Sequence, residues 1–250
     1  MWLNLFIICT LGFLAAAVDA IAGGGGLISL PALLMAGVPP HLALGTNKFS
    51  ASLASLNSSI TFARSGKVHF QLVKWQVPFA LIGAFLGTWA VLGVSSAFLN
   101  KAILVLILVV GIYTLLHKNL GMENHFKGLD ISHIFVGCLF ALALGFYDGF
   151  FGPGTGSFLI FSFIAFFGFD FVVASANAKV LNFTSNFAAL VLFAWNGKIL
   201  LFYGIPMALF MILGSYVGTR LAIQRGVGLV KPIFITMSLL VAVKLIYQFL

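Results

Sequence analysis

The chain has 250 residues, of which 62% are hydrophobic and only 7% charged, with a mean hydropathy of +1.16. A soluble domain has roughly 25% charged residues and leaves much of its surface in water. This composition therefore excludes a soluble enzyme, a disordered chain and a disulfide-rich secreted scaffold. The net charge of +8 does not indicate nucleic-acid binding, because most Lys and Arg residues separate apolar runs instead of forming one basic surface.

Most apolar runs are continuous and about 20 residues long, which predicts membrane-crossing α-helices. Strands of a membrane β-barrel would instead alternate in hydropathy. The first run is interpreted as a retained helix, because a signal peptide would begin with a basic region. The predicted fold is an all-α polytopic membrane protein. In chain order the predicted segments are Trp2–Ala22, Leu27–Gly37, Pro40–Arg64, Trp75–Val94, Ala97–Leu116, Ile131–Phe151, Thr155–Phe169, Phe171–Trp195, Ile199–Leu221 and Val227–Leu250.

The second and seventh segments are too short to cross a membrane alone. Runs of about 11 to 15 residues rise only about 16–22 Å as α-helix, against a hydrocarbon core of roughly 30 Å. Each follows a glycine-rich loop, Gly23–Gly26 in one case and Gly152–Gly156 in the other. We therefore expect broken or re-entrant helices at these two places.

The two loops belong to an internal repeat. Asp19 and Asp148, each just before its glycine cluster, are 129 positions apart, while Lys48 and Lys179 are 131 apart. Such long-period similarity between membrane segments is typical of duplicated transporters. The sequence predicts two repeats of about five helical segments each, residues 1–119 and 120–250, in one membrane domain.

The distribution of Lys and Arg predicts how the repeats are oriented. With five crossings per half, eight basic residues share one side and three lie on the other; with four crossings the split weakens to seven against four. Because basic residues favour the cytoplasmic side, five crossings fit better. The two repeats would then be inverted, with both termini outside. The eight are Arg64, Lys67, Lys74, Lys118, Lys127, Arg220, Arg225 and Lys231.

Four ionisable residues lie deep within predicted membrane segments: Asp19, Asp148, Lys48 and Lys179. An ionised group at this depth costs several kcal/mol unless it is paired or hydrated, so all four are candidate functional residues. The lysines would supply positive charge to a substrate. The carboxylates would carry a coupling proton, because burial favours their protonated form. The alternative is a structural role, in which Asp19 pairs with Lys48 and Asp148 with Lys179.

The neighbouring residues predict a site for a small anion. A helix that begins after a glycine loop presents unpaired N–H groups and the positive end of its dipole, and side-chain amides add further donors. The glycines could alternatively serve close helix packing alone. No spacing of His, Cys or acidic residues indicates a metal site, and no cofactor is expected. The predicted binding residues are Gly24, Gly25, Gly26, Asn47, Lys48, Gly154, Thr155, Gly156, Asn177, Lys179, Asn182 and Asn186.

Three strings resemble the duplicated signatures of the TauE/SafE sulfite exporter family, most closely its YfcA-type branch of probable membrane transporters. They are DAIAGGGGLISLPALLMAGVPPHLALGTNK (Asp19 to Lys48), GFYDGFFGPGTGSF (Gly145 to Phe158) and ANAKVLNFTSN (Ala176 to Asn186). The resemblance covers nearly the whole chain, including the region of Lys231 and Lys244. It implies a multi-pass protein of the bacterial inner membrane that transports sulfur-containing anions such as sulfite, sulfonates or sulfoacetate, most often as an exporter. The substrate of the YfcA-type branch is generally unassigned.

The expected function is therefore a secondary transporter, not an enzyme, driven by protons or by the membrane potential. Its partners would be a small anionic substrate and the lipid bilayer; the oligomeric state is left open, a homo-oligomer included. Two alternatives remain at this stage. A passive anion channel would show no stimulation by substrate on the far side. A non-transporting accessory protein would need a docking surface, and the longest polar gap, residues 117–130, is short.

Overall fold

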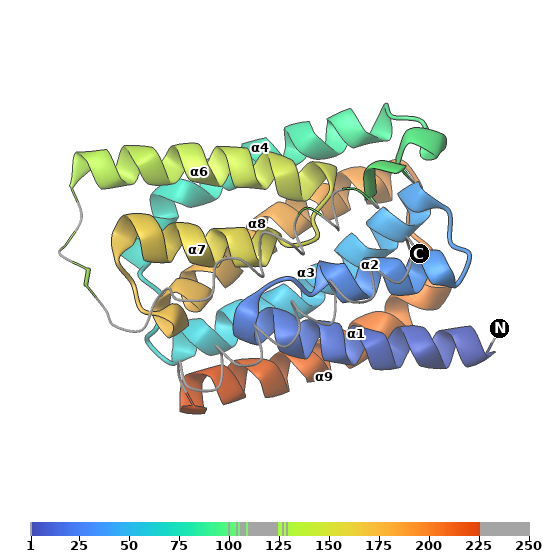
Figure 1. Cartoon of the computed structure of the whole chain (residues 1–250), viewed down its shortest axis with the longest axis horizontal. Helices are drawn as coiled ribbons and strands as arrows, with labels where there is room; N and C mark the ends of the chain where they lie inside the picture. The colour runs from blue at the N-terminus through green and yellow to red at the C-terminus, as the bar shows by residue number, and fades with distance from the viewer. Residues whose placement is uncertain are drawn as a thin grey trace.

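The described part of the chain is built from α-helices (Figure 1). The computed structural model describes residues 2–99, 101–103, 105, 109, 125–126, 128 and 130–225, and no strand occurs among them. The tenth predicted segment, most of the fifth and the predicted boundary at 119/120 lie outside these residues. The helices are α1 (Trp2–Ala22), α2 (Gly26–Met35), α3 (Pro40–Arg64), α4 (Phe70–Leu92), α6 (Ile131–Phe150), α7 (Thr155–Phe167), α8 (Phe171–Trp195) and α9 (Leu201–Arg225).

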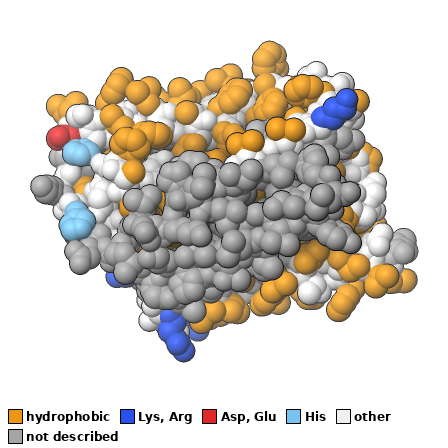
Figure 2. Space-filling view, viewed as in Figure 1, with side chains coloured by type: hydrophobic (Ala, Val, Ile, Leu, Met, Phe, Trp, Pro, Cys, Tyr) orange, Lys and Arg blue, Asp and Glu red, His pale blue; other side chains and the backbone are white. Residues whose placement is uncertain are grey.

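Five described helices, α1, α4, α6, α8 and α9, are long and apolar enough to cross a membrane. Helix α3 has 25 residues, as does α8, but it carries a row of serines that lowers its hydropathy. Hydrophobic side chains cover the upper and lower margins of the face in Figure 2, whereas the Lys and Arg side chains visible there lie toward its two ends. This distribution is typical of a protein surrounded by lipid. The predicted all-α polytopic fold is confirmed.

The sequence predicted the bounds of α1, α3 and α8 to the residue, and those of α4 and α9 less well. Helix α4 begins at Phe70, five residues before the predicted start, because Gln71 and Lys74 interrupt the apolar pattern there. Helix α9 continues to Arg225, four residues past the predicted end, since its last turn is also polar. Both extensions lie where a helix can leave the hydrocarbon region.

The two short helices are broken away from their predecessors by glycines with positive φ. Gly23 and Gly24 have φ of +76° and +84°, and Gly152 and Gly154 have +93° and +86°. Residues with a side chain rarely adopt this backbone conformation, so each glycine loop ends one helix and redirects the chain. The two loops also touch: a Cβ on Gly156 would lie only 2.9 Å from the Cα of Gly23.

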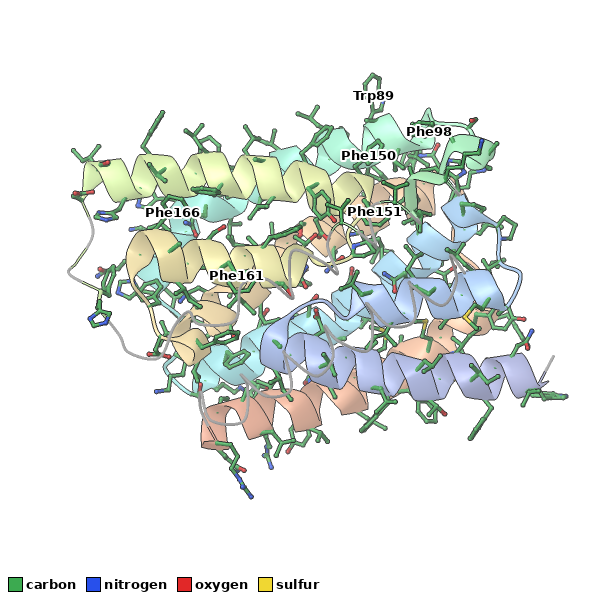
Figure 3. The ribbon with its side chains drawn as sticks, in the orientation of Figure 1. Trp89, Phe98, Phe150, Phe151, Phe161 and Phe166 are labelled. Carbon is green, nitrogen blue, oxygen red and sulfur yellow. The ribbon has the colours of Figure 1, made fainter. Side chains whose placement is uncertain are left out.

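Helix α7 packs one face inward and leaves the other exposed. Phe161 is buried in an aromatic-rich core that also contains Phe163 and Phe167, whereas Phe166 is about half exposed. Figure 3 shows Phe161 and Phe166 on this helix. A short helix with one buried face is fixed in place by its neighbours even though it cannot span the membrane by itself.

The long helices pack across the two predicted halves. In α4, added Cβ atoms on Gly83 and Gly87 would collide with the carbonyl oxygens of Leu142 and Phe146 in α6. The repeat-related contacts between α9 and α1 are Gly214 with Phe13 and Gly218 with Ala17. Residue numbers rise together within each pair, so α4 runs parallel to α6 and α9 parallel to α1. These crossed contacts suit inverted repeats, whose orientation across the membrane stays a prediction.

Candidate functional site

Helices α3 and α8 place one lysine each at the centre of the bundle. Helix α3 begins with Pro40, whose fixed φ suits the first turn of a helix. Helix α8 is capped by the Asp170 carboxylate, which accepts from two backbone N–H groups of the first turn. Lys48 and Lys179 follow about two turns later. Their side chains are only 3% and 0% exposed.

Each lysine forms an ion pair with the acid of the other half. The Nζ of Lys48 lies 2.9 Å from the Oδ1 of Asp148, and the Nζ of Lys179 lies 2.6 Å from the Oδ2 of Asp19. The alternative from the sequence, in which Asp19 pairs with Lys48 and Asp148 with Lys179, is therefore wrong. The physical reason is the crossed packing of the helices, which places the end of α1 beside α8 and the end of α6 beside α3.

The two ion pairs differ in their surroundings. The Asp148 carboxylate, 2% exposed, also accepts from the Ser185 hydroxyl, and Lys48 donates to the Oδ1 of Asn186 at 2.9 Å. The Asp19 carboxylate is 25% exposed and accepts from the backbone N–H of Gly25 at 3.0 Å. One pair is thus enclosed by side chains, whereas the other leaves part of its carboxylate open.

A small cavity lies at this centre. Both halves contribute to it, and the N-terminal ends of α2 and α7 reach it through their glycine loops. The first N–H groups of a helix have no acceptor within the helix, so such ends favour anions. The cavity is lined by Asp19, Gly24, Gly25, Gly26, Ser29, Asn47, Lys48, Ala51, Ala54, Asp148, Gly152, Gly154, Gly156, Asn182, Asn186 and Met211.

The structure brings most of the predicted site residues to this cavity, but not Thr155, Asn177 or Lys179. The hydroxyl of Thr155 donates to the Gly152 carbonyl at 2.7 Å and closes the glycine loop. Lys179 is fully buried and does not line the cavity, and its Nζ contacts the lining residue Asp19. Its expected direct contact with substrate is therefore not supported by the geometry.

Asn177 holds a loop instead of facing the cavity. Its Oδ1 accepts from the backbone N–H of His69 at 2.8 Å, and its Nδ2 donates to the Val173 carbonyl at 2.7 Å. The repeat-related residue, Thr46, accepts in the same way from the N–H of Leu200 at 2.9 Å. Both residues therefore fix the start of the following helix of the other half.

Several lining residues were missed by sequence reasoning. Gly152 is the first residue of the second predicted loop and Ser29 follows the first loop by three residues, and closer attention to the loop ends could have found both. Ser29 donates to the Gly25 carbonyl at 3.1 Å. Ala51, Ala54 and Met211 give no chemical signal, because small and apolar residues are ordinary in membrane helices. They add apolar surface to a lining that also holds the amides of Asn182 and Asn186.

Asn47 is the lining residue with an unsatisfied polar atom. Its side chain is 93% buried, and its Oδ1 has no hydrogen-bond partner. A buried amide oxygen without a partner costs free energy, so this position favours occupation by a donor such as water or a protonated ligand. The charges of the four side chains sum to zero while both ion pairs are intact, so in that state the helix ends and amide groups supply the net positive potential. Among the described residues, no group of His, Cys, Asp or Glu has metal-site geometry.

The sequence is similar to membrane proteins of one family over nearly its whole length. Residues 8–245 match the family model described as "Sulfite exporter TauE/SafE". A "Probable membrane transporter protein" of Haemophilus influenzae is 41% identical, with 98% of this chain and 95% of that protein covered. The "Probable membrane transporter protein YfcA" of Escherichia coli K12 is 37% identical, with 98% and 91% covered. A "Probable membrane transporter protein ORF9" of Sinorhizobium is 38% identical, with 94% and 89% covered. No solved structure matches significantly.

Proposed function

The chain belongs to the sulfite exporter TauE/SafE family, and we propose that it is a secondary transporter of small sulfur-containing or organic anions, of the sulfite, sulfonate or sulfoacetate class. It is a membrane transporter of the TauE/SafE type and a multi-pass protein of the bacterial inner membrane. The substrate class, an export direction and the driving force are the proposed part.

The crossed ion pairs at the cavity carry this proposal. Each pair joins one half of the molecule to the other, through Lys48 and Asp148 on one side and Lys179 and Asp19 on the other. Secondary transporters built from repeats bind substrate at the interface between the repeats, beside broken helices. A substrate that breaks or replaces one of these ion pairs would directly change the contacts between the two halves.

In the proposed mechanism, the anion enters beside the two glycine loops. Backbone N–H groups near Gly24–Gly26 and Gly154–Gly156 would grip its oxygens, and the Nδ2 groups of Asn182 and Asn186 would add hydrogen bonds. Lys48 lines the cavity and would supply the positive charge, while Lys179 acts through Asp19. An anion that binds Lys48 would weaken the ion pair with Asp148, since both draw on the charge of the same ammonium group.

This weakening of the ion pair supplies a route to proton coupling. If the anion takes the Lys48 ammonium from Asp148, an ionised carboxylate is left buried and unpaired. Such a group is costly in a low-dielectric interior, so Asp148 would take up a proton as the anion binds. Asp19, which is partly open to the cavity, would exchange protons with water more readily. A transporter without this coupling would instead carry the anion alone, driven by the membrane potential.

The experiment is transport into liposomes that contain the purified chain. Uptake of labelled sulfite, thiosulfate, taurine and sulfoacetate, with carboxylates for comparison, would be measured with and without a pH gradient. We expect saturable uptake of one sulfur anion and stimulation by the same anion inside. Uptake that neither saturates nor responds to internal substrate would favour a passive channel, and no flux together with tight co-purification of a partner would favour an accessory protein.

Variants then test the residues. Lys48→Ala and Lys179→Ala should lose flux, whereas Lys74→Ala, at an exposed lysine outside the cavity, should keep it. Undiminished flux in the double variant at Lys48 and Lys179 would remove both lysines from the mechanism. Flux that ignores the pH gradient would remove proton coupling and leave the potential as the driving force.

A further inference from the structure

A second recess lies on the surface, between the C-terminal parts of α3 and α9. It is open to the outside and shares no lining residue with the central cavity. Arg64 is the last residue of α3, and Arg220 lies five residues before the end of α9. The lining residues are Thr61, Arg64, Ser65, Tyr216, Arg220, Ile223 and Gln224.

The two arginines are available to an external anion. Both are exposed, and no carboxylate of the described residues forms an ion pair with either one. The guanidinium of Arg220 lies 4.4 Å from the ring centroid of Tyr216, which holds it in place by a cation–π contact. A planar guanidinium binds two oxygens of a phosphate group at once, so two arginines in one recess favour a phosphate ester.

The position of the recess along the helices indicates the membrane side. The loop that follows Arg64 carries Lys67, and Lys74 lies in the first turns of α4. This end of the bundle therefore collects basic residues, which places it on the cytoplasmic side by the positive-inside rule. Anionic phospholipids attract basic groups in this leaflet, and basic pockets between membrane helices bind their headgroups.

The repeat offers an internal comparison. With the offset of 131, Arg64 corresponds to Trp195, and Arg220 corresponds to Trp89. Both tryptophans are exposed, 88% and 69% respectively, and Trp89 projects away from the bundle in Figure 3. Trp89 lies about 28 Å along α4 from Phe70, the end near Arg64. Repeat-related positions at the two opposite ends of the helix bundle thus carry tryptophan at one end and arginine at the other.

This difference distinguishes general anchoring at the membrane interface from recognition of a charged lipid. Tryptophan is typical of a membrane interface whatever the charge of the lipid, so it would have served either end as an anchor. The arginine pair adds a preference for negative charge at only one end. We propose that the recess between α3 and α9 binds the phosphate of an anionic phospholipid in the cytoplasmic leaflet, with phosphatidylglycerol as the simplest candidate.

The test measures lipid binding by the full chain in detergent micelles. Native mass spectrometry would count retained phosphatidylglycerol against phosphatidylcholine, and thermal unfolding would be followed with each lipid added. We expect preferential retention of phosphatidylglycerol and a raised unfolding temperature, because a ligand of the native state stabilises it. The double variant Arg64→Gln, Arg220→Gln should weaken this binding roughly tenfold or more.

The matched control removes two positive charges from the same end, in Lys67→Gln with Lys74→Gln, and should keep most of the binding. An equal loss in the two double variants would reduce the effect to general surface charge and overturn the proposal. Soluble glycerol phosphate separates the two sources of the phosphate: stabilisation as large as that by the lipid would assign the recess to a soluble phosphate ester instead. Both double variants should unfold at the wild-type temperature in phosphatidylcholine alone, since all four side chains are exposed.

Discussion

The buried ion pair between Lys48 and Asp148 gives the sharpest prediction. Replacement of Lys48 by Met leaves the carboxylate of Asp148, 2% exposed, with the Ser185 hydroxyl but without its cation. Removing one partner of a buried pair typically costs about 3–5 kcal/mol. At roughly 2–4 °C per kcal/mol for a chain of this size, the unfolding temperature should fall by about 6–20 °C.

Removing both charges should restore most of that stability. In Lys48→Met with Asp148→Asn, no ionised group is left unpaired, and replacement of a buried pair by neutral residues is often close to neutral. Thermal unfolding in detergent gives the unfolding temperatures of the single variant, the double variant and Lys74→Met, which is the exposed control. A fall of less than about 2 °C in Lys48→Met, or a double variant less stable than Lys48→Met, would contradict the ion pair as described.

Three further predictions concern the two asparagines, the close packing of α4 on α6, and the cap of α6. Asn177→Ala should lower the unfolding temperature and leave the KM of transport unchanged, whereas Asn47→Ala should change KM with little loss of stability; thermal unfolding and liposome uptake check both. Gly87→Ala should cost about 1–3 kcal/mol because its Cβ would meet the backbone of α6, while Gly93→Ala, which has space, should not; unfolding in detergent compares them. Hydrogen bonds from the first turn of α6 lower the pKa of Asp130. The contribution of its carboxylate to the stability of that turn is therefore present above the ordinary carboxyl pKa and is lost as pH falls through the lowered value. The protection factors of the amides in that turn, measured by hydrogen exchange, should fall over the same range.

The helices could be predicted from the sequence because their lengths follow from the hydrocarbon thickness. The glycine loops could be predicted too, since Gly23 and Gly152 stand where the chain must turn with positive φ. The depth of Lys48 and Lys179 followed from the same reasoning. These features depend on local sequence, so no knowledge of the packing between helices was needed.

The pairing of charges could not be predicted in the same way. Whether Asp19 meets Lys48 or Lys179 depends on how two helices that are 160 residues apart in the chain pack together. Asn177 looked like a ligand because it precedes a buried lysine, but both ends of its amide bind backbone groups. Met211 lines the cavity without any polar atom that could have indicated it. Tertiary packing decides each of these cases.

Counterflow in liposomes tests most directly whether the cavity between the halves transports an anion. Vesicles would hold wild type or the variant Lys48→Met with Asp148→Asn, which we expect to keep its fold, and would be loaded with the best substrate among the sulfur anions. We predict that internal substrate accelerates uptake of labelled substrate in wild type and that the variant loses this uptake. Equal, trans-stimulated uptake by the two proteins would show that transport does not pass through this cavity.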